Sequence, residues 1–122
     1  MLRIINVGIA SFGMSGKVFH APLLASNNKF KIKRIIERTK NDAKSIYPQA
    51  LVTRSVEDLL ADDEVELIIV NTPDENHFDL AKKCLQVGKH VVVEKPFTQT
   101  VRQAEELIEL AQRQKLVLSV FQ

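Results

Sequence analysis

The chain has little of what a secreted or membrane protein needs. Its single cysteine, Cys84, excludes a disulfide within the chain, so a reducing compartment suits it. No apolar run approaches the roughly 20 residues of a membrane-spanning helix. No basic segment followed by a long apolar run opens the chain, as it would in a signal peptide. We therefore expect a cytoplasmic protein without membrane contact.

An excess of charge of one sign is also missing. The formal net charge of +2 over 122 residues is too mild to indicate nucleic-acid binding. The one basic cluster is interpreted as the solvent-facing side of an edge segment: Lys29, Lys31, Lys33 and Arg34. No cysteines and histidines have the spacing of metal ligands, so we expect no metal site. A content of 45% hydrophobic and 26% charged residues is typical of one globular domain.

Short apolar runs alternate with helical patterns along the chain. Strands are predicted at residues 3–7, 31–36, 50–53, 67–71, 90–94 and 116–121. The runs 67–70 and 91–93 are apolar without alternation, which is typical of central parallel strands covered on both faces. The helical pattern at 74–87 ends at Gly88. This alternation predicts an α/β fold, a doubly wound parallel sheet of about six strands in the order 3-2-1-4-5-6, with helices on both faces.

Capping residues mark the expected helix starts. Ser55 with Asp58, and Thr72 with Glu75, have the form of a capping box. Thr98 is expected to cap the last helix.

The turn after the first strand is the most informative segment. Ser11-Phe12-Gly13-Met14-Ser15-Gly16 keeps two glycines of the pattern G-x-G-x-x-G, with Ser11 in the first glycine position. A strand that turns into a helix through glycines brings free N–H groups and the positive helix end together, which suits a pyrophosphate. The alternative is a turn that only lets the strand pack against the helix. Pro22 is expected to break the following helix near residues 20–22.

Glu37 supports the interpretation of this turn as a pyrophosphate site. It ends the second predicted strand, 21 positions after Gly16, where dinucleotide folds hold the adenosine ribose with an acidic residue. A solvated loop charge is the competing interpretation. Cofactor identity stays open, because Glu37 would accept hydrogen bonds from a ribose diol and so favours NAD. Arg38, Thr39 and Lys40 could instead cradle the 2′-phosphate of NADP.

Two more strand ends carry candidate residues. Asn71-Thr72-Pro73 follows one strand, and His77 lies in the next helical turn, where it either approaches a cofactor or holds the turn through backbone hydrogen bonds. Glu94-Lys95-Pro96 follows another strand. Lys95 is suited to donate a hydrogen bond to a substrate oxygen on which charge develops. The alternative is an ordinary surface ion pair between Glu94 and Lys95.

Taken together, these segments resemble the amino-terminal domain of the glucose-fructose oxidoreductase / inositol dehydrogenase / MocA (Gfo/Idh/MocA) family of NAD(P)-dependent oxidoreductases. The resemblance covers essentially the whole chain. It is carried by Gly8 with residues 12–16, residues 18–22, Thr72-Pro73 with His77, residues 88–91 and residues 94–98.

The resemblance implies hydride transfer between NAD or NADP and a hydroxyl carbon of a sugar, inositol or related polyol. It assigns Lys95 a catalytic position beside the nicotinamide, Thr72 and Pro73 a place against the cofactor, and Glu37 with Arg38 the adenosine ribose. The full set of expected cofactor-binding residues is Gly8, Ser11, Phe12, Gly13, Met14, Ser15, Gly16, Glu37, Arg38, Asn71, Thr72, Pro73, His77, Glu94 and Lys95.

Two departures from the family pattern matter. Ser11 occupies a glycine position, and members of the family continue into a further α+β domain that supplies most of the substrate pocket and a catalytic histidine. We therefore expect residues 1–122 to be a dinucleotide-binding domain that binds cofactor better than it turns a substrate over. A homo-oligomer is expected to form through the further domain. The alternative function is a stand-alone NAD(P)-sensing module without catalysis, against which Lys95 argues.

Overall fold

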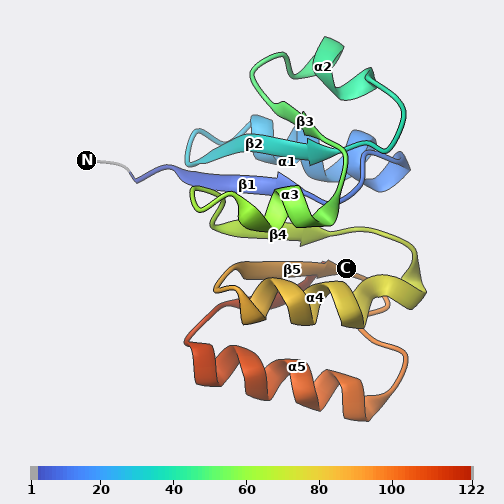
Figure 1. Cartoon of the computed structure of the whole chain (residues 1–122), viewed down its shortest axis with the longest axis vertical. Helices are drawn as coiled ribbons and strands as arrows, with labels where there is room; N and C mark the ends of the chain where they lie inside the picture. The colour runs from blue at the N-terminus through green and yellow to red at the C-terminus, as the bar shows by residue number, and fades with distance from the viewer. Residues whose placement is uncertain (1–2, 122) are drawn as a thin grey trace.

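Six parallel strands form one sheet in the order β3-β2-β1-β4-β5-β6 in the computed structural model, which describes residues 3–121 (Figure 1). Every neighbouring pair is parallel. The strands are β1 (Ile5–Ile9), β2 (Phe30–Ile36), β3 (Leu51–Thr53), β4 (Leu67–Val70), β5 (His90–Glu94) and β6 (Leu118–Phe121). The predicted fold class and strand order are confirmed. Residues 1, 2 and 122 of the predicted domain lie outside the described residues.

Helices cover both faces of this sheet, as predicted. They are η1 (Ser15–His20), α1 (Ala21–Ala25), α2 (Asp42–Ile46), α3 (Val56–Ala61), η2 (Asp74–Asn76), α4 (His77–Gln86) and α5 (Val101–Gln114). One buried cluster joins the sheet to α3, α4 and α5, and a second joins it to α1 and α2. In Figure 1, α3 and α4 lie in front of the sheet and α1 lies behind it.

Strand β4 shows why its sequence has no alternation. Ile68 and Val70 belong to the first cluster, whereas Ile69 belongs to the second. Successive side chains of a strand point to opposite faces, so a strand that is covered on both sides buries all of them. β4 is therefore the central, doubly covered strand that the run 67–70 predicts.

Two local predictions about helix starts have different outcomes. Ser55 caps α3 as expected, because its Oγ accepts a hydrogen bond from the Asp58 N–H at 3.1 Å. Thr98 does not cap α5. The cap is Thr100, whose Oγ1 accepts from the Gln103 N–H at 3.1 Å.

The predicted helix break at Pro22 is wrong. The chain stays helical from η1 through α1, and Pro22 lies in the first turn of α1. The proline therefore lies inside a continuous helical segment, directly after the π-helical turn η1, in which the Ala21 N–H donates five residues back to the Gly16 carbonyl oxygen.

The basic cluster is also not on an edge segment. β2 is an inner strand that pairs with both β1 and β3. Lys33 and Arg34 bind the carboxylate of Asp62, with Lys33 Nζ 2.9 Å from Oδ1 and Arg34 Nε 2.5 Å from Oδ2. The Asp62 side chain is only 7% exposed.

These contacts make Asp62 a source of pH-dependent stability. Burial alone would raise its pKa, but the hydrogen bonds from Arg34 and Lys33 outweigh burial and hold the pKa well below its usual range. A carboxylate with a depressed folded-state pKa stabilises the fold above its unfolded pKa of about 3.9 and loses that contribution as the pH falls.

We expect Asp62→Asn to lower the free energy of unfolding at pH 7 by roughly 2 kcal/mol, the scale of hydrogen bonds to charged groups. The difference from the wild type should shrink as the pH falls below about 4. Urea unfolding followed by circular dichroism at pH 7 and pH 3 measures both effects. The matched control is Asp63→Asn, because Asp63 is exposed. Equal losses in the two variants would contradict the assignment.

Candidate functional site

A cavity of about 360 Å³ lies at the carboxyl ends of β1, β2 and β4. Because β1 lies between β2 and β4, the segments that follow these three strands meet at one edge of the sheet. The cavity is lined by Ala10, Ser11, Phe12, Gly13, Ile36, Glu37, Arg38, Thr39, Lys40, Thr72 and Pro73. The structure thus brings the predicted glycine loop, the turn after β2 and the turn after β4 to one site.

The two glycines of the loop differ in their surroundings. A Cβ on Gly16 would lie 2.3 Å from the Ser11 carbonyl oxygen and 2.9 Å from Asn71 Nδ2, so only glycine allows this close approach. A Cβ on Gly13 would meet only Ser11 Oγ, at 3.6 Å, and otherwise faces open space. Ser11, in the first glycine position, accepts a hydrogen bond from the Gly13 N–H through Oγ at 3.3 Å. Gly16 therefore shapes the loop, and Gly13 leaves room beside the cavity.

Two buried oxygens at the end of β4 have no hydrogen-bond partner within the described residues: Asn71 Oδ1 and Thr72 Oγ1. Asn71 is 8% exposed, and its Nδ2 donates to the Ser11 carbonyl oxygen at 2.8 Å, which fixes the side chain against the loop. A buried polar atom without a partner costs about 1–3 kcal/mol. Both oxygens fit a site that is completed by a polar ligand.

The predicted capping role of Thr72 is wrong. The turn after β4 starts as η2 with Pro73 in the cap position, and no side chain caps it. The extended backbone of Pro73, with ψ of 149°, separates Thr72 from the helical turn.

Glu37 forms part of the cavity wall and is only 7% exposed. Its Oε1 accepts a hydrogen bond from the Ala43 N–H in α2 at 2.9 Å. Arg38, Thr39 and Lys40 are exposed. One carboxylate oxygen of Glu37 is thus committed to the protein, and its expected contact with an adenosine ribose stays a prediction.

Lys95 follows β5 at the same edge of the sheet, beyond β4, and does not line the cavity. Its neighbour Glu94 binds His20, with Oε2 2.6 Å from Nε2. Lys95 itself lies in the bend after β5, and no ion pair joins it to Glu94 among the described residues. The alternative of a Glu94–Lys95 ion pair is not what the structure shows, and Lys95 is exposed.

His77 joins the two turns that follow β4 and β5. It is fully buried, with Nε2 2.8 Å from the Thr72 carbonyl oxygen and Nδ1 2.8 Å from the Pro96 carbonyl oxygen. These contacts favour the structural alternative for His77. They do not test its expected contact with a cofactor.

Two other predicted residues lie away from the cavity. Gly8 is inside β1, where a Cβ would lie 2.4 Å from Leu59 Cδ1 and 3.3 Å from Val65 Cγ1, so its place is set by packing of α3 on the sheet. Met14 is 79% exposed and does not line the cavity. Ser15, the first residue of η1, does not line the cavity either, and its Oγ accepts a hydrogen bond from Asn71 Nδ2 at 3.3 Å.

Arg54, which follows β3, also supports the site, although no motif in the sequence marks it. Its guanidinium donates to the Glu37 and Lys40 carbonyl oxygens, at 2.9 and 2.6 Å, and to Asn41 Oδ1 at 2.5 Å. No motif spacing connects Arg54 with the turn that it holds. Only the pairing of β3 with β2 indicates that the two segments are neighbours.

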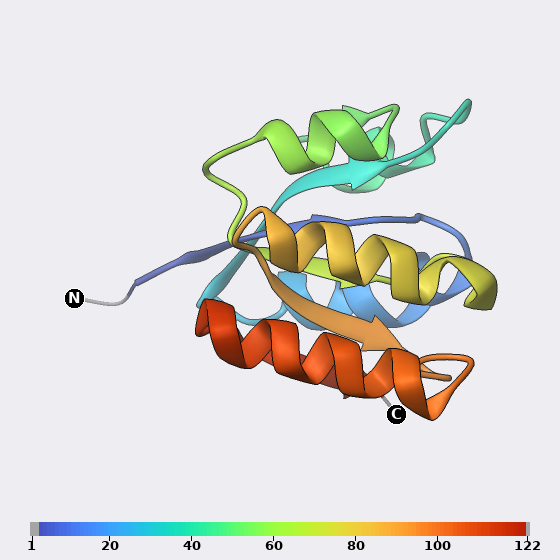
Figure 2. The ribbon, with the colours of Figure 1, turned by 60° about the horizontal axis from the view of Figure 1, so that its bottom comes forward.

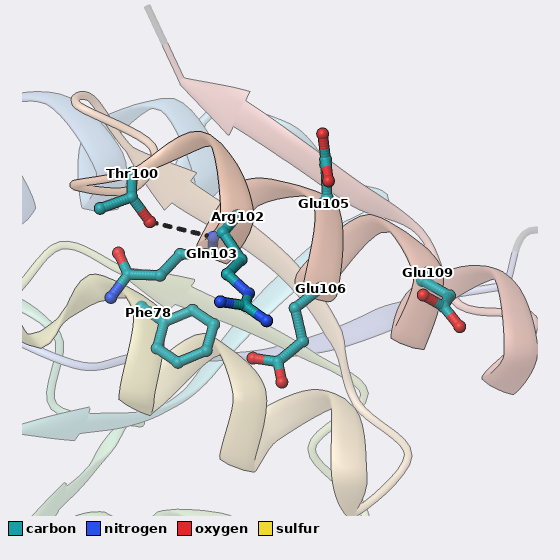
Figure 3. Close-up of a pocket in the computed structure, with 7 residues that line it drawn as sticks. All are labelled: Phe78, Thr100, Arg102, Gln103, Glu105, Glu106 and Glu109. Atoms are coloured by element: carbon teal, nitrogen blue, oxygen red, sulfur yellow. Dashed lines mark hydrogen bonds between the residues drawn. The ribbon is translucent and has the colours of Figure 1, made fainter.

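A larger hollow of about 550 Å³ lies over α4 and α5 (Figure 3). Its lining is Phe78, Thr100, Arg102, Gln103, Glu105, Glu106 and Glu109. Figure 3 shows the Arg102 guanidinium beside the Phe78 ring and the carboxylates spread along α5. Three carboxylates against one guanidinium disfavour a pyrophosphate, so this hollow is poorly suited to a dinucleotide.

Cys84 does not contribute a nucleophile. It is fully buried in α4, and burial raises the pKa of its thiol to about 12. Within residues 3–121 no three side chains of the kinds that ligate metals gather in one place. Over the same residues, no helix is both long enough and apolar enough to cross a bilayer.

Comparison with known proteins agrees with this site. Residues 5–122 match the family model described as "Oxidoreductase family, NAD-binding Rossmann fold". The scyllo-inositol 2-dehydrogenase (NADP(+)) IolW of Bacillus subtilis is 39% identical over 117 residues, which is 96% of this chain and 33% of that protein.

Two solved structures are similar in both sequence and shape. A Bacteroides fragilis protein is 53% identical with a TM-score of 0.97, and the match covers 99% of this chain and 38% of that one. The 3-ketoreductase KijD10 of Actinomadura kijaniata, solved with NADP and TDP-benzene, is 27% identical with a TM-score of 0.90, covering 97% of this chain and 37% of that one.

The chain spans about a third of the length of the curated relatives that it matches. The match to the family model covers nearly all of it, and the fold, the glycine loop and the cavity agree with that match. The chain belongs to the Gfo/Idh/MocA oxidoreductase family and carries its NAD(P)-binding Rossmann domain.

Proposed function

We propose that this chain is the cofactor-binding part of an enzyme that transfers a hydride between NAD(P) and a hydroxyl carbon of a sugar, inositol or related polyol. The observation that carries the proposal is the cavity beside the glycine loop, next to which Asn71 Oδ1 and Thr72 Oγ1 are buried without partners. The printed activities of the relatives, a scyllo-inositol 2-dehydrogenase and a 3-ketoreductase, agree with it.

The residues divide into three contacts along a dinucleotide. The open side of Gly13 and the first N–H groups of η1 suit the pyrophosphate, because no side chain blocks the approach. The turn of Glu37 and Arg38 suits the adenosine ribose. Thr72 and Pro73 line the cavity from the segment after β4, the strand next to the one that Lys95 follows.

The bound nicotinamide supplies the hydride chemistry. This chain contributes Lys95, which is exposed at the carboxyl edge and is not engaged by Glu94. Its ammonium can donate a hydrogen bond to the substrate oxygen and stabilise the charge that develops there. Because Glu94 is held by His20, the strand end that carries Lys95 is fixed to the helix after the glycine loop.

Titration of the chain with NADH and NADPH tests the first half of the proposal. The fluorescence of the reduced nicotinamide can be followed directly, because no aromatic side chain absorbs at the wavelength that excites it. We expect saturable binding of at least one dinucleotide, with a Kd on the order of 10–100 µM, about −5.5 to −7 kcal/mol.

Reduced nicotinamide mononucleotide is the control ligand. It lacks the adenosine half and therefore the partner of the turn after β2, so it should bind more weakly. A folded chain that binds neither dinucleotide would contradict the proposal.

The proposal includes the cellular location and the oligomeric state of the whole enzyme. A cytoplasmic location suits a chain whose only cysteine is a buried thiol. Formation of a homo-oligomer through a further domain stays a prediction.

A further inference from the structure

The turn after β2 is held from behind by a residue of another strand. Arg54 follows β3, and Nη1 donates to the carbonyl oxygens of Glu37 at 2.9 Å and Lys40 at 2.6 Å. Nη2 donates to Asn41 Oδ1 at 2.5 Å. One guanidinium therefore connects both ends of the turn 37–41, which its planar fork of donors suits well.

This clamp determines where the exposed side chains of the turn point. Arg38, Thr39 and Lys40 line the cavity, and within residues 3–121 their side chains make no hydrogen bond to the protein. Their direction depends on the backbone of the turn, whose two carbonyl groups Arg54 binds. Loops without such partners sample many conformations. Loss of Arg54 would therefore let the charged side chains of Arg38 and Lys40 occupy a wider range of positions.

The charge around the turn favours an anion rather than a neutral hydroxyl. Arg38 and Lys40 are exposed cations on the cavity wall. The competing carboxylate, Glu37, is 7% exposed and already accepts a hydrogen bond from the Ala43 N–H. A group that carries two negative charges gains more from the cations than it loses to this one buried carboxylate.

We propose that Arg54 is a positioning residue that gives this site a preference for NADP over NAD, by holding the turn 37–41 so that Arg38 and Lys40 meet the 2′-phosphate. The inference rests on the proposed NAD(P)-binding function. Arg54 acts through the turn and does not itself line the cavity.

Binding of NADPH and NADH to the wild-type chain and to Arg54→Met, measured by calorimetry, tests this inference. The wild type should bind NADPH about tenfold more tightly, as expected for two exposed charge pairs of up to about 1 kcal/mol each. Arg54→Met should weaken NADPH binding by about tenfold and leave NADH binding within about threefold, because NADH lacks the phosphate that the cations meet. Arg54→Lys, which keeps the charge but not the fork, should lose most of the same preference.

The matched control is Arg113→Met. Arg113 is exposed in the last turn of α5, and helices that connect parallel strands run back toward the opposite edge of the sheet (Figure 2). The Arg113→Met substitution removes one positive charge far from the turn 37–41, so the affinities for NADPH and NADH should both stay unchanged. Circular dichroism checks that each variant is folded. If Arg54→Met does not fold, the comparison of NADPH and NADH affinities is made with Arg54→Lys.

The outcomes separate the two proposals. If the wild type binds neither dinucleotide, the proposed function fails. If it binds both equally, or prefers NADH, the function stands and the inference about Arg54 is wrong. A folded Arg54 variant that loses equal affinity for both dinucleotides shows a merely structural role and also overturns the inference.

Discussion

Gly13→Val should abolish binding of NADH and NADPH while the chain still folds. A Cβ on Gly13 meets only Ser11 Oγ at 3.6 Å, so the branched side chain has space within the protein itself. That space borders the cavity and faces the proposed path of the pyrophosphate. We expect the Kd to rise by at least about a hundredfold, roughly 2.7 kcal/mol, because the phosphates lose their approach to the loop.

Gly16→Ala is the informative comparison for this variant. Its added carbon would lie 2.3 Å from the Ser11 carbonyl oxygen, so it must displace the loop and should lower both stability and affinity. Thermal unfolding and fluorescence titration of the two variants therefore separate a blocked site from a distorted one. Normal affinity in a folded Gly13→Val chain would place the dinucleotide elsewhere.

The sequence predicted the sheet well because its signals are local. A run of consecutive apolar residues such as Leu67–Val70 is stable only where both faces of a strand are covered, and that identifies a central strand. The right-handed connection between parallel strands then leaves few possible strand orders. The glycine loop was found for the same reason, since its residues are contiguous.

The start of α5 shows a local signal that was available but misread. Thr98 and Thr100 both precede the helix, and only the second is followed three residues later by a residue that completes a capping box. Gln103 forms a variant of this box: its N–H donates to Thr100 Oγ1, and its Oε1 accepts at 3.1 Å from the N–H of Gln99, the residue before the cap. The residue three positions after each threonine therefore distinguishes the cap from its neighbour.

The remaining parts of the site depend on contacts between distant segments. Arg54 meets the turn after β2 only because β3 pairs with β2, and His20 meets Glu94 across 74 positions of the chain. Nothing near either residue in the sequence marks its partner. Basic residues of β2 were likewise assigned to solvent because Asp62, which binds two of them, belongs to the segment after α3.

Lys95→Ala should affect chemistry far more than binding, in an enzyme that carries this domain together with a substrate domain. Lys95 does not line the cavity that suits the adenosine half and the pyrophosphate, so the Kd for cofactor should stay within about threefold. Turnover should fall by about a hundredfold or more, as expected when a positioned donor to the substrate oxygen is lost. Stopped-flow measurement of hydride transfer, with cofactor affinity measured separately, distinguishes the two effects.

The matched control is Lys83→Ala. Lys83 is also exposed and lies in α4, away from the edge where the strands end, so its loss should leave both affinity and turnover unchanged. In the 122-residue chain, Lys95→Ala should leave cofactor binding equally unaffected, because no substrate oxygen is present for its ammonium to meet. If Lys95 instead served folding, Lys95→Ala should lower the free energy of unfolding both in the 122-residue chain and in the enzyme. Near-normal turnover in Lys95→Ala would show that this lysine is only an exposed charge beside the site, since Glu94 already has His20 as its partner.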